Sequence, residues 1–69
     1  MPRHQEFKIR IGSIILIESY PTKVKIRVNT ILNGERIEGT CVEQDTLAIH
    51  SVGQPVSGYM TDILQVISF

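Results

Sequence analysis

Cysteine, tryptophan and long apolar runs are scarce or missing in this 69-residue sequence. Cys41 is the only cysteine, so no disulfide can form within the chain, and one cysteine with two histidines does not suggest a four-ligand zinc site. The longest apolar run, residues 14–17, is too short to cross a membrane, and no signal peptide is recognisable. We therefore expect a single domain over residues 1–69 that is cytoplasmic, with no membrane contact, metal or cofactor.

Small size limits what a lone copy of the chain can bury. A domain of this length buries only about 60% of the surface that its unfolded chain exposes, so its stability is marginal. Such domains are stabilised by disulfides, by metals or by association, and only association is left here. The composition therefore predicts a homo-oligomer.

Net charge is also absent, because seven basic residues balance seven acidic ones. The two signs are separated along the chain: residues 1–32 carry six basic and two acidic residues, and residues 33–69 carry one basic and five acidic residues. One interpretation is cross-strand pairing within a hairpin, in which Arg27 and Glu38 are diagonal neighbours. A second is head-to-tail attraction between subunits. A third, a basic face for nucleic acid, is weakened by the zero net charge.

Helical periodicity is missing too, and β-branched residues dominate. Strict alternation of apolar and polar residues from Lys23 to Thr30 predicts a half-buried strand. Other strands are expected where short apolar stretches lie between turn residues such as Tyr20-Pro21 and Gly53-Gln54-Pro55. These strands involve residues 7–11, 14–17, 37–41, 47–49, 56–60 and 63–69.

An Asn-Gly pair marks the clearest hairpin. Asn33-Gly34 favours a type I′ turn, because Asn and Gly tolerate the positive φ that both central positions need. Counted across a two-residue loop, Ile37, Gly39 and Cys41 continue the apolar face of the preceding strand. Gly39 within a strand indicates a bulge or a sharp bend. Short, strongly bent strands of this kind predict an all-β protein, a small five-stranded open barrel of SH3-like or OB-like type.

The run from Val24 to Phe69 resembles the Sm-like family, which includes the bacterial RNA chaperone Hfq. On this reading residues 1–12 are an N-terminal arm or extra strand, and residues 23–69 hold the two Sm motifs of a divergent member. The first motif is matched by the alternating strand and the spacing of Asn33, Gly34, Ile37, Gly39 and Asp45, and the second by Leu47, Ile49, Val56, Ile63, Leu64, Val66 and Ile67.

The resemblance implies a bent five-stranded sheet whose edge strands pair with neighbouring subunits. We expect a closed homo-oligomeric ring of about five to eight subunits, because head-to-tail contacts between unpaired edges close when the rotation permits. Ring closure would bury the apolar side chains near the end of the sequence, namely Met60, Ile63, Leu64, Ile67 and Phe69.

The positions that hold RNA in the family are altered here. Family members carry an Asn soon after the motif aspartate and an Arg-Gly in the second motif, and Hfq carries Tyr-Lys-His. This chain has Thr46 after Asp45, and Met60, Thr61 and Asp62 in the second motif. The planar base-holding group and the cation are both missing, so weak binding of oligo-U is expected at that site. Asp45 either lines the pore or caps a turn.

Other candidate residues admit a functional and a structural interpretation. Lys23, Lys25 and Arg27 form a basic stripe with Tyr20 nearby, which is either a track for single-stranded RNA or a solvated strand face. His50 is expected to face solvent or an interface rather than a ligand. Cys41 is expected to be a buried thiol.

Nothing in the sequence pairs a nucleophile with a base or forms a phosphate-binding glycine loop, so an enzyme is not predicted. The favoured hypothesis is a ring-forming Sm-like protein that binds RNA, as an RNA chaperone or an accessory factor in RNA processing. The alternatives are a homo-oligomeric protein scaffold without nucleic acid and a monomeric SH3-like binding module.

Overall fold

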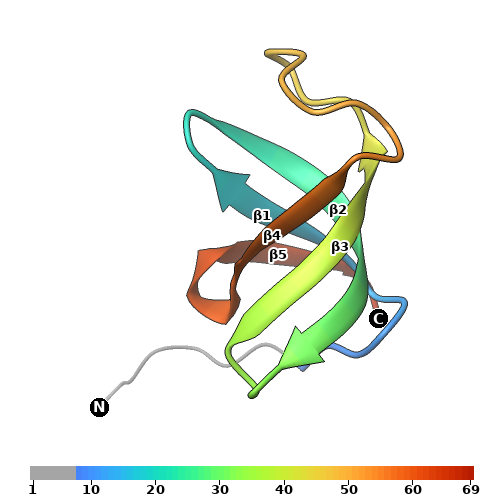
Figure 1. Cartoon of the computed structure of the whole chain (residues 1–69), viewed down its shortest axis with the longest axis vertical. Helices are drawn as coiled ribbons and strands as arrows, with labels where there is room; N and C mark the ends of the chain where they lie inside the picture. Colours follow the sequence, from blue (N-terminus) through green and yellow to red (C-terminus); the bar gives the residue numbers. More distant parts are fainter. Residues whose placement is uncertain (1–7) are drawn as a thin grey trace.

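Five antiparallel strands form one sheet in the computed structural model, which describes residues 8–69 (Figure 1). Their order across the sheet is β4-β3-β2-β1-β5, so β4 and β5 are its two edges and do not pair with each other. The all-β class and the five-stranded antiparallel sheet are confirmed, and the sheet is not closed. The strands are β1 (Ile14–Ser19), β2 (Thr22–Leu32), β3 (Arg36–Glu43), β4 (Pro55–Tyr59) and β5 (Ile63–Ser68).

The core consists of the apolar residues that alternate along the strands. In β2 the predicted alternation is confirmed, because Val24, Ile26 and Val28 are buried while Lys23 and Arg27 are exposed. Since successive side chains of a strand point to opposite faces, the buried apolar residues of β2 lie on the inner face of the curved sheet. The core is completed by Ile15 and Ile17 of β1, Ile37 and Cys41 of β3, Val56 of β4 and Ile63 of β5.

The β2–β3 hairpin has the predicted turn in a modified register. Asn33 and Gly34 both have positive φ, 54° and 72°, as a type I′ turn requires. The loop holds three residues rather than two, since Leu32 pairs with Arg36. Asn29 is an extra residue in β2 that has no partner in the pairing with β3. Beyond it the strands pair as a two-residue loop would have them, with Val28 opposite Gly39.

Gly39 lies in β3 where the β2 backbone leaves no room for a side chain. It pairs with Val28, and a Cβ at this position would overlap the carbonyl oxygen of Arg27 and lie 2.9 Å from the Ile26 Cδ1. Of the bulge and the sharp bend predicted at Gly39, the ladder shows a register shift directly beside it, where the extra residue is Asn29 of β2, and a second shift lies between Lys25 and Ile26. The sharp bend stays a prediction, and the glycine is needed because it leaves room for the β2 backbone.

Two predicted strands are wrong. Residues 47–49 lie in the β3–β4 loop, because Ala48 has a φ of 58° and its N–H bonds the Asp45 carbonyl at 3.0 Å, which makes a tight turn. Residues 8–11 are not a strand either, and Phe7 lies outside the described residues. There Gly12, with a φ of 98°, and the bond from the Ser13 N–H to the Arg10 carbonyl turn the chain into β1.

A single 3₁₀ turn, η1 (Met60–Asp62), connects β4 to β5 and takes Met60 out of the strand in which the sequence placed it. The Asp62 Oδ2 accepts a hydrogen bond from the Tyr59 N–H at 3.1 Å, and the Met60 N–H bonds the Glu35 carbonyl at 2.8 Å. Within residues 8–69 no helix has the length and apolar character needed to cross a membrane.

Candidate nucleic-acid interface

A groove of about 550 Å³ lies between the β1–β2 turn and the β3–β4 loop. Its floor comes from outward-facing residues of β1 and β2, because every second side chain of these strands points away from the core. Pro21 and Thr22 form one wall, and residues 43–47 form the other. The floor residues are Leu16, Glu18, Lys23 and Lys25.

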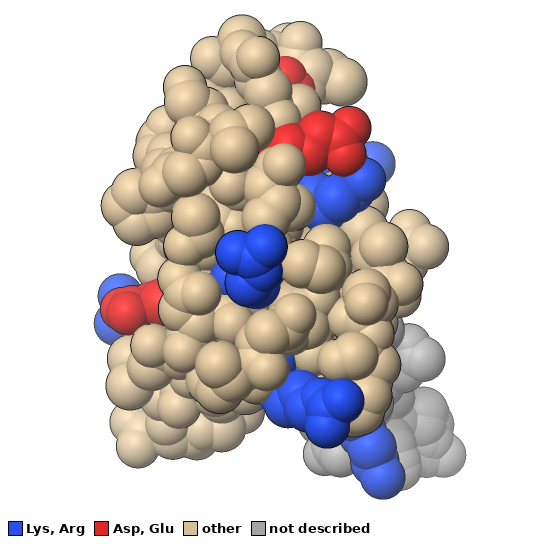
Figure 2. Space-filling model, turned by 90° about the vertical axis from the view of Figure 1, so that its right-hand side faces the viewer, with Lys and Arg blue, Asp and Glu red and all other residues tan. Residues whose placement is uncertain are grey.

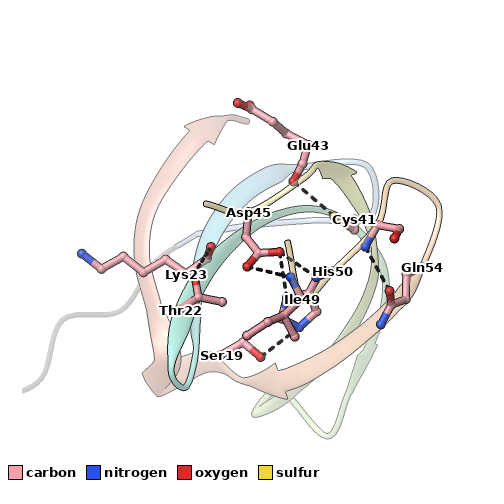
Figure 3. Close-up of polar contacts among 10 residues, drawn as sticks. Ser19, Thr22, Lys23, Cys41, Glu43, Asp45, Ile49, His50 and Gln54 are labelled. Carbon is pink, nitrogen blue, oxygen red and sulfur yellow. Dashed lines mark hydrogen bonds and ion pairs between the residues drawn. The ribbon is translucent and has the colours of Figure 1, made fainter. Parts of the chain in front are cut away.

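Asp45 shapes the loop wall of this groove (Figure 3). Its carboxylate accepts a hydrogen bond from the His50 N–H at 2.6 Å and another from the Ile49 N–H at 3.3 Å. Burial alone would raise the pKa of Asp45. The hydrogen bonds from these amides and the nearby His50 ring lower the pKa by more than burial raises it, so it lies below the ordinary 3.8. Of the two roles predicted for Asp45, the structure provides the turn-capping one.

His50 ties the loop to the end of β1. The ring is buried, so the prediction of a solvent-facing histidine is wrong within this chain. Its Nε2 lies 3.4 Å from the Ser19 Oγ, and its Nδ1 lies 3.4 Å from the Asp45 Oδ1 without hydrogen-bond geometry (Figure 3). Both Asp45 oxygens already accept backbone N–H groups, so this arrangement holds a loop in place.

The basic stripe of β2 faces acidic residues on both neighbouring strands. Lys23 is opposite Glu18 of β1, and Lys25 forms an ion pair with Glu43 of β3 at 2.6 Å. Arg27 is opposite Thr40, and Glu38 pairs with Thr30 on the other side of the extra residue Asn29. Figure 2 shows one face of the molecule, on which basic atoms form separate patches, some with acidic atoms beside them. Within residues 8–69 Lys25 is the one cation of the stripe that forms an ion pair, and acidic residues on the neighbouring strands keep the stripe from being a continuous cationic track.

Tyr20 stands at the tip of the β1–β2 turn, next to the groove wall formed by Pro21. It is 91% exposed, the largest exposure among the large hydrophobic residues of the described chain. An aromatic ring that contacts little of its own protein offers a free face for stacking. Tyr20 and Lys23 thus flank the same turn, one as a planar group and the other as an exposed cation.

The residues that the resemblance places in one RNA site do not meet within the chain. Asp45 and Thr46 follow β3, whereas Met60, Thr61 and Asp62 follow β4, which runs antiparallel to β3. The two groups therefore lie at opposite ends of the β3–β4 pair.

Sequence reasoning missed Glu18 and Glu43 as groove residues. The parity of β1 could have found Glu18, because it alternates with the apolar Ile15 and Ile17 and then faces Lys23 across the Tyr20-Pro21 turn. Nothing in the sequence predicted that residues 43–47 form a wall of the groove, and residues 47–49 were predicted to be a strand. Among residues 8–69, no group of His, Cys, Asp or Glu side chains could hold a metal ion.

Comparisons with known proteins add no relative to this description. No family model, no curated protein and no solved structure matches the chain.

Proposed function

We propose that this chain is an Sm-like protein that assembles into a homo-oligomeric ring and binds single-stranded RNA. The observation that carries the RNA part is the pairing of a nearly fully exposed Tyr20 with a groove that contains Lys23. Proteins that bind single strands combine cations for the phosphates with aromatic faces for the bases, and stacking of this kind contributes about 1–3 kcal/mol per base.

The ring part rests on the sheet edges. Both β4 and β5 have one unpaired side, and β5 carries Leu64 and Ile67, each 43% exposed, with Phe69 60% exposed just after it. Long apolar edges invite pairing with another chain. Ile63 and Met60 belong to the chain's own packing instead, since Ile63 is 5% exposed and Met60 packs against the core.

A protein scaffold without RNA is the second candidate, and charge compensation of the basic stripe favours it. Lys25 already has Glu43 as its ion-pair partner, and Glu18 stands opposite Lys23 in the strand pairing. The RNA contacts that we propose are therefore Tyr20, Lys23 and Arg27, with Lys25 engaged within the protein.

Two measurements test the proposal. Light scattering at micromolar concentration should give a mass of about five to eight subunits. Fluorescence anisotropy with labelled oligonucleotides should show binding that weakens as salt rises, with Tyr20→Ala lowering affinity about tenfold. Each of Lys23→Ala and Arg27→Ala should reduce the slope of log affinity against log salt by about 0.7, the value for one phosphate contact on a single strand.

Arg36→Ala is the matched control, because Arg36 is an exposed cation whose guanidinium lies 6.0 Å from the Tyr59 ring, at the far end of β3 from the groove. It should leave the affinity unchanged. If an assembled ring binds no RNA even at low salt, the scaffold becomes the better assignment. A monomeric mass would instead favour an SH3-like module.

A further inference from the structure

The groove contains one carboxylate that the protein does not use. Glu43 is paired with Lys25, and Asp45 accepts two backbone N–H groups. Glu18 differs from both: it is exposed on the groove floor opposite Lys23, and within residues 8–69 no ion pair or hydrogen bond occupies its side chain. Within residues 8–69 this carboxylate is therefore a hydrogen-bond acceptor without a protein donor.

Apolar side chains line the groove together with that carboxylate. Leu16 lies two residues before Glu18 on the same outward face of β1, and Pro21 and Leu47 contribute to the two walls. Leu47 is 54% exposed. Apolar side chains beside an acceptor that has no partner in the protein suit a heteroaromatic ring that is bound by its faces and read at one polar edge.

We infer that the groove binds a guanine base of the RNA, read at its Watson–Crick edge by the Glu18 carboxylate. This inference rests on the proposed RNA binding and adds base selectivity to it. Guanine carries the N1–H and the N2 amino group side by side, so both can donate to the two oxygens of one carboxylate.

The other bases fit an acceptor-only partner less well. Uracil has one N–H between two carbonyl oxygens, and these would face the carboxylate lone pairs. Adenine and cytosine each place an amino donor beside an unprotonated ring nitrogen, so that a carboxylate gains one hydrogen bond and loses the second. The neighbouring groups complete the site: Lys23 faces Glu18 across the strand pair and meets a phosphate, and Tyr20 stacks on the adjacent base.

Anisotropy titrations of the intact protein with four short oligo-U strands test the inference. The strands differ only in the central nucleoside, which is guanosine, inosine, adenosine or uridine. The strand with guanosine should bind about tenfold more tightly than the strand with uridine, as expected for a bidentate base contact. Inosine, which lacks the N2 amino group, should lose most of that preference.

Two variants assign the preference to the carboxylate. Glu18→Gln should bind the guanosine and uridine strands equally, and its affinity for the uridine strand should not fall, because a negative charge near the phosphates has been removed. Glu35→Gln is the matched control: Glu35 is an exposed acid in the β2–β3 turn, away from the groove residues, and its loss should leave the guanosine preference intact.

The outcomes separate the two proposals. Equal affinity of the wild type for all four strands, still reduced by Tyr20→Ala, would overturn the guanine assignment and leave RNA binding standing. Equal binding of guanosine and inosine would also overturn it, because the amino group would then not be read. Absence of binding to every strand by the assembled protein would overturn both and favour a protein ligand for the groove.

Discussion

Gly39 illustrates how one residue without a side chain fixes the spacing of two strands. The sequence marked it as a special position within a strand and predicted a bulge or a sharp bend there. The structure gives a different reason, which is the close approach of the Arg27 carbonyl and the Ile26 side chain. Sequence patterns report where the backbone needs a glycine, and they do not report which neighbour requires it.

Substitution of Gly39 by alanine should destabilise the fold by about 1–3 kcal/mol, the usual cost of overpacking, and valine should cost more. The obstacle is backbone, which cannot rotate away as a side chain can. Gly58→Ala is the control, since its Cβ would meet the end of the Ile17 side chain at 2.7 Å, and that methyl group can move. Chemical denaturation checks both; equal losses for the two variants would contradict the backbone explanation.

Asp45 gives the fold a defined pH dependence. Its pKa is lowered in the folded protein by backbone amide donors that outweigh the effect of burial. A group with a lowered folded pKa stabilises the protein above its unfolded pKa, here about pH 4, and that contribution is lost as the pH falls through the folded value. The difference in unfolding free energy between the wild type and Asp45→Asn should therefore be constant from pH 7 to pH 5 and shrink below pH 4.

Asp45→Asn should also loosen the turn itself. Asn offers one acceptor oxygen where Asp offers two, so the amide hydrogens of Ile49 and His50 should exchange faster in Asp45→Asn at neutral pH. Unchanged exchange at both amides, or a difference in stability that stays the same from pH 7 to pH 3, would contradict the turn-capping role of the Asp45 carboxylate.

At the level of elements, alternation predicted the strands well and the loops poorly. β2 and β3 were predicted because apolar and polar residues alternate where one face packs on a core. Leu47 and Ile49 imitate the same alternation, but they are 54% and 47% exposed in a turn. Hydrogen bonds to the Asp45 carbonyl and carboxylate make this segment a turn. The spacing of apolar residues carries no information about these hydrogen bonds.

The candidate interface was predicted in part for the same reason. Tyr20, Lys23 and Arg27 came from the parity of β2 and the turn before it. Glu18 could have been found from the parity of β1, but the loop wall depends on how the β3–β4 loop folds in space, which no pattern of residues along the chain predicts. Cross-strand pairing of charges was predicted for Arg27 and Glu38, whereas the ion pair in the structure joins Lys25 and Glu43, which the sequence did not indicate.

The Lys25–Glu43 ion pair should restrain RNA binding more than it stabilises the fold. The two side chains are 34% and 64% exposed, and pairs of this kind contribute about 0–1 kcal/mol. Glu43→Gln should therefore change the unfolding free energy by less than about 1 kcal/mol while it frees Lys25 for phosphate, which raises RNA affinity and steepens its salt dependence. Anisotropy at two salt concentrations checks this, with Glu35→Gln as the control, and a loss of affinity would contradict it.

At the level of the whole molecule, the proposed ring depends on the apolar edge at β5. Ile67→Lys should reduce the mass measured by light scattering to that of a monomer, because a charge on an edge strand opposes pairing with another chain. The control is Val52→Lys: Val52 is more exposed, at 65%, but lies in the β3–β4 loop, so the mass should not change. An unchanged mass for Ile67→Lys would move the interface elsewhere.

The pairing of β5 with β1 also sets an order of events in time. Ile14 pairs with Ser68, so the first and last strands must meet across nearly the whole described chain before the sheet is complete. Contacts of such long range form slowly, because the entropy of closing the loop is lost before the contacts are gained. β5 becomes a sheet edge only after this step. The proposed association of chains through β5 is bimolecular, so it follows the unimolecular pairing of β5 with β1.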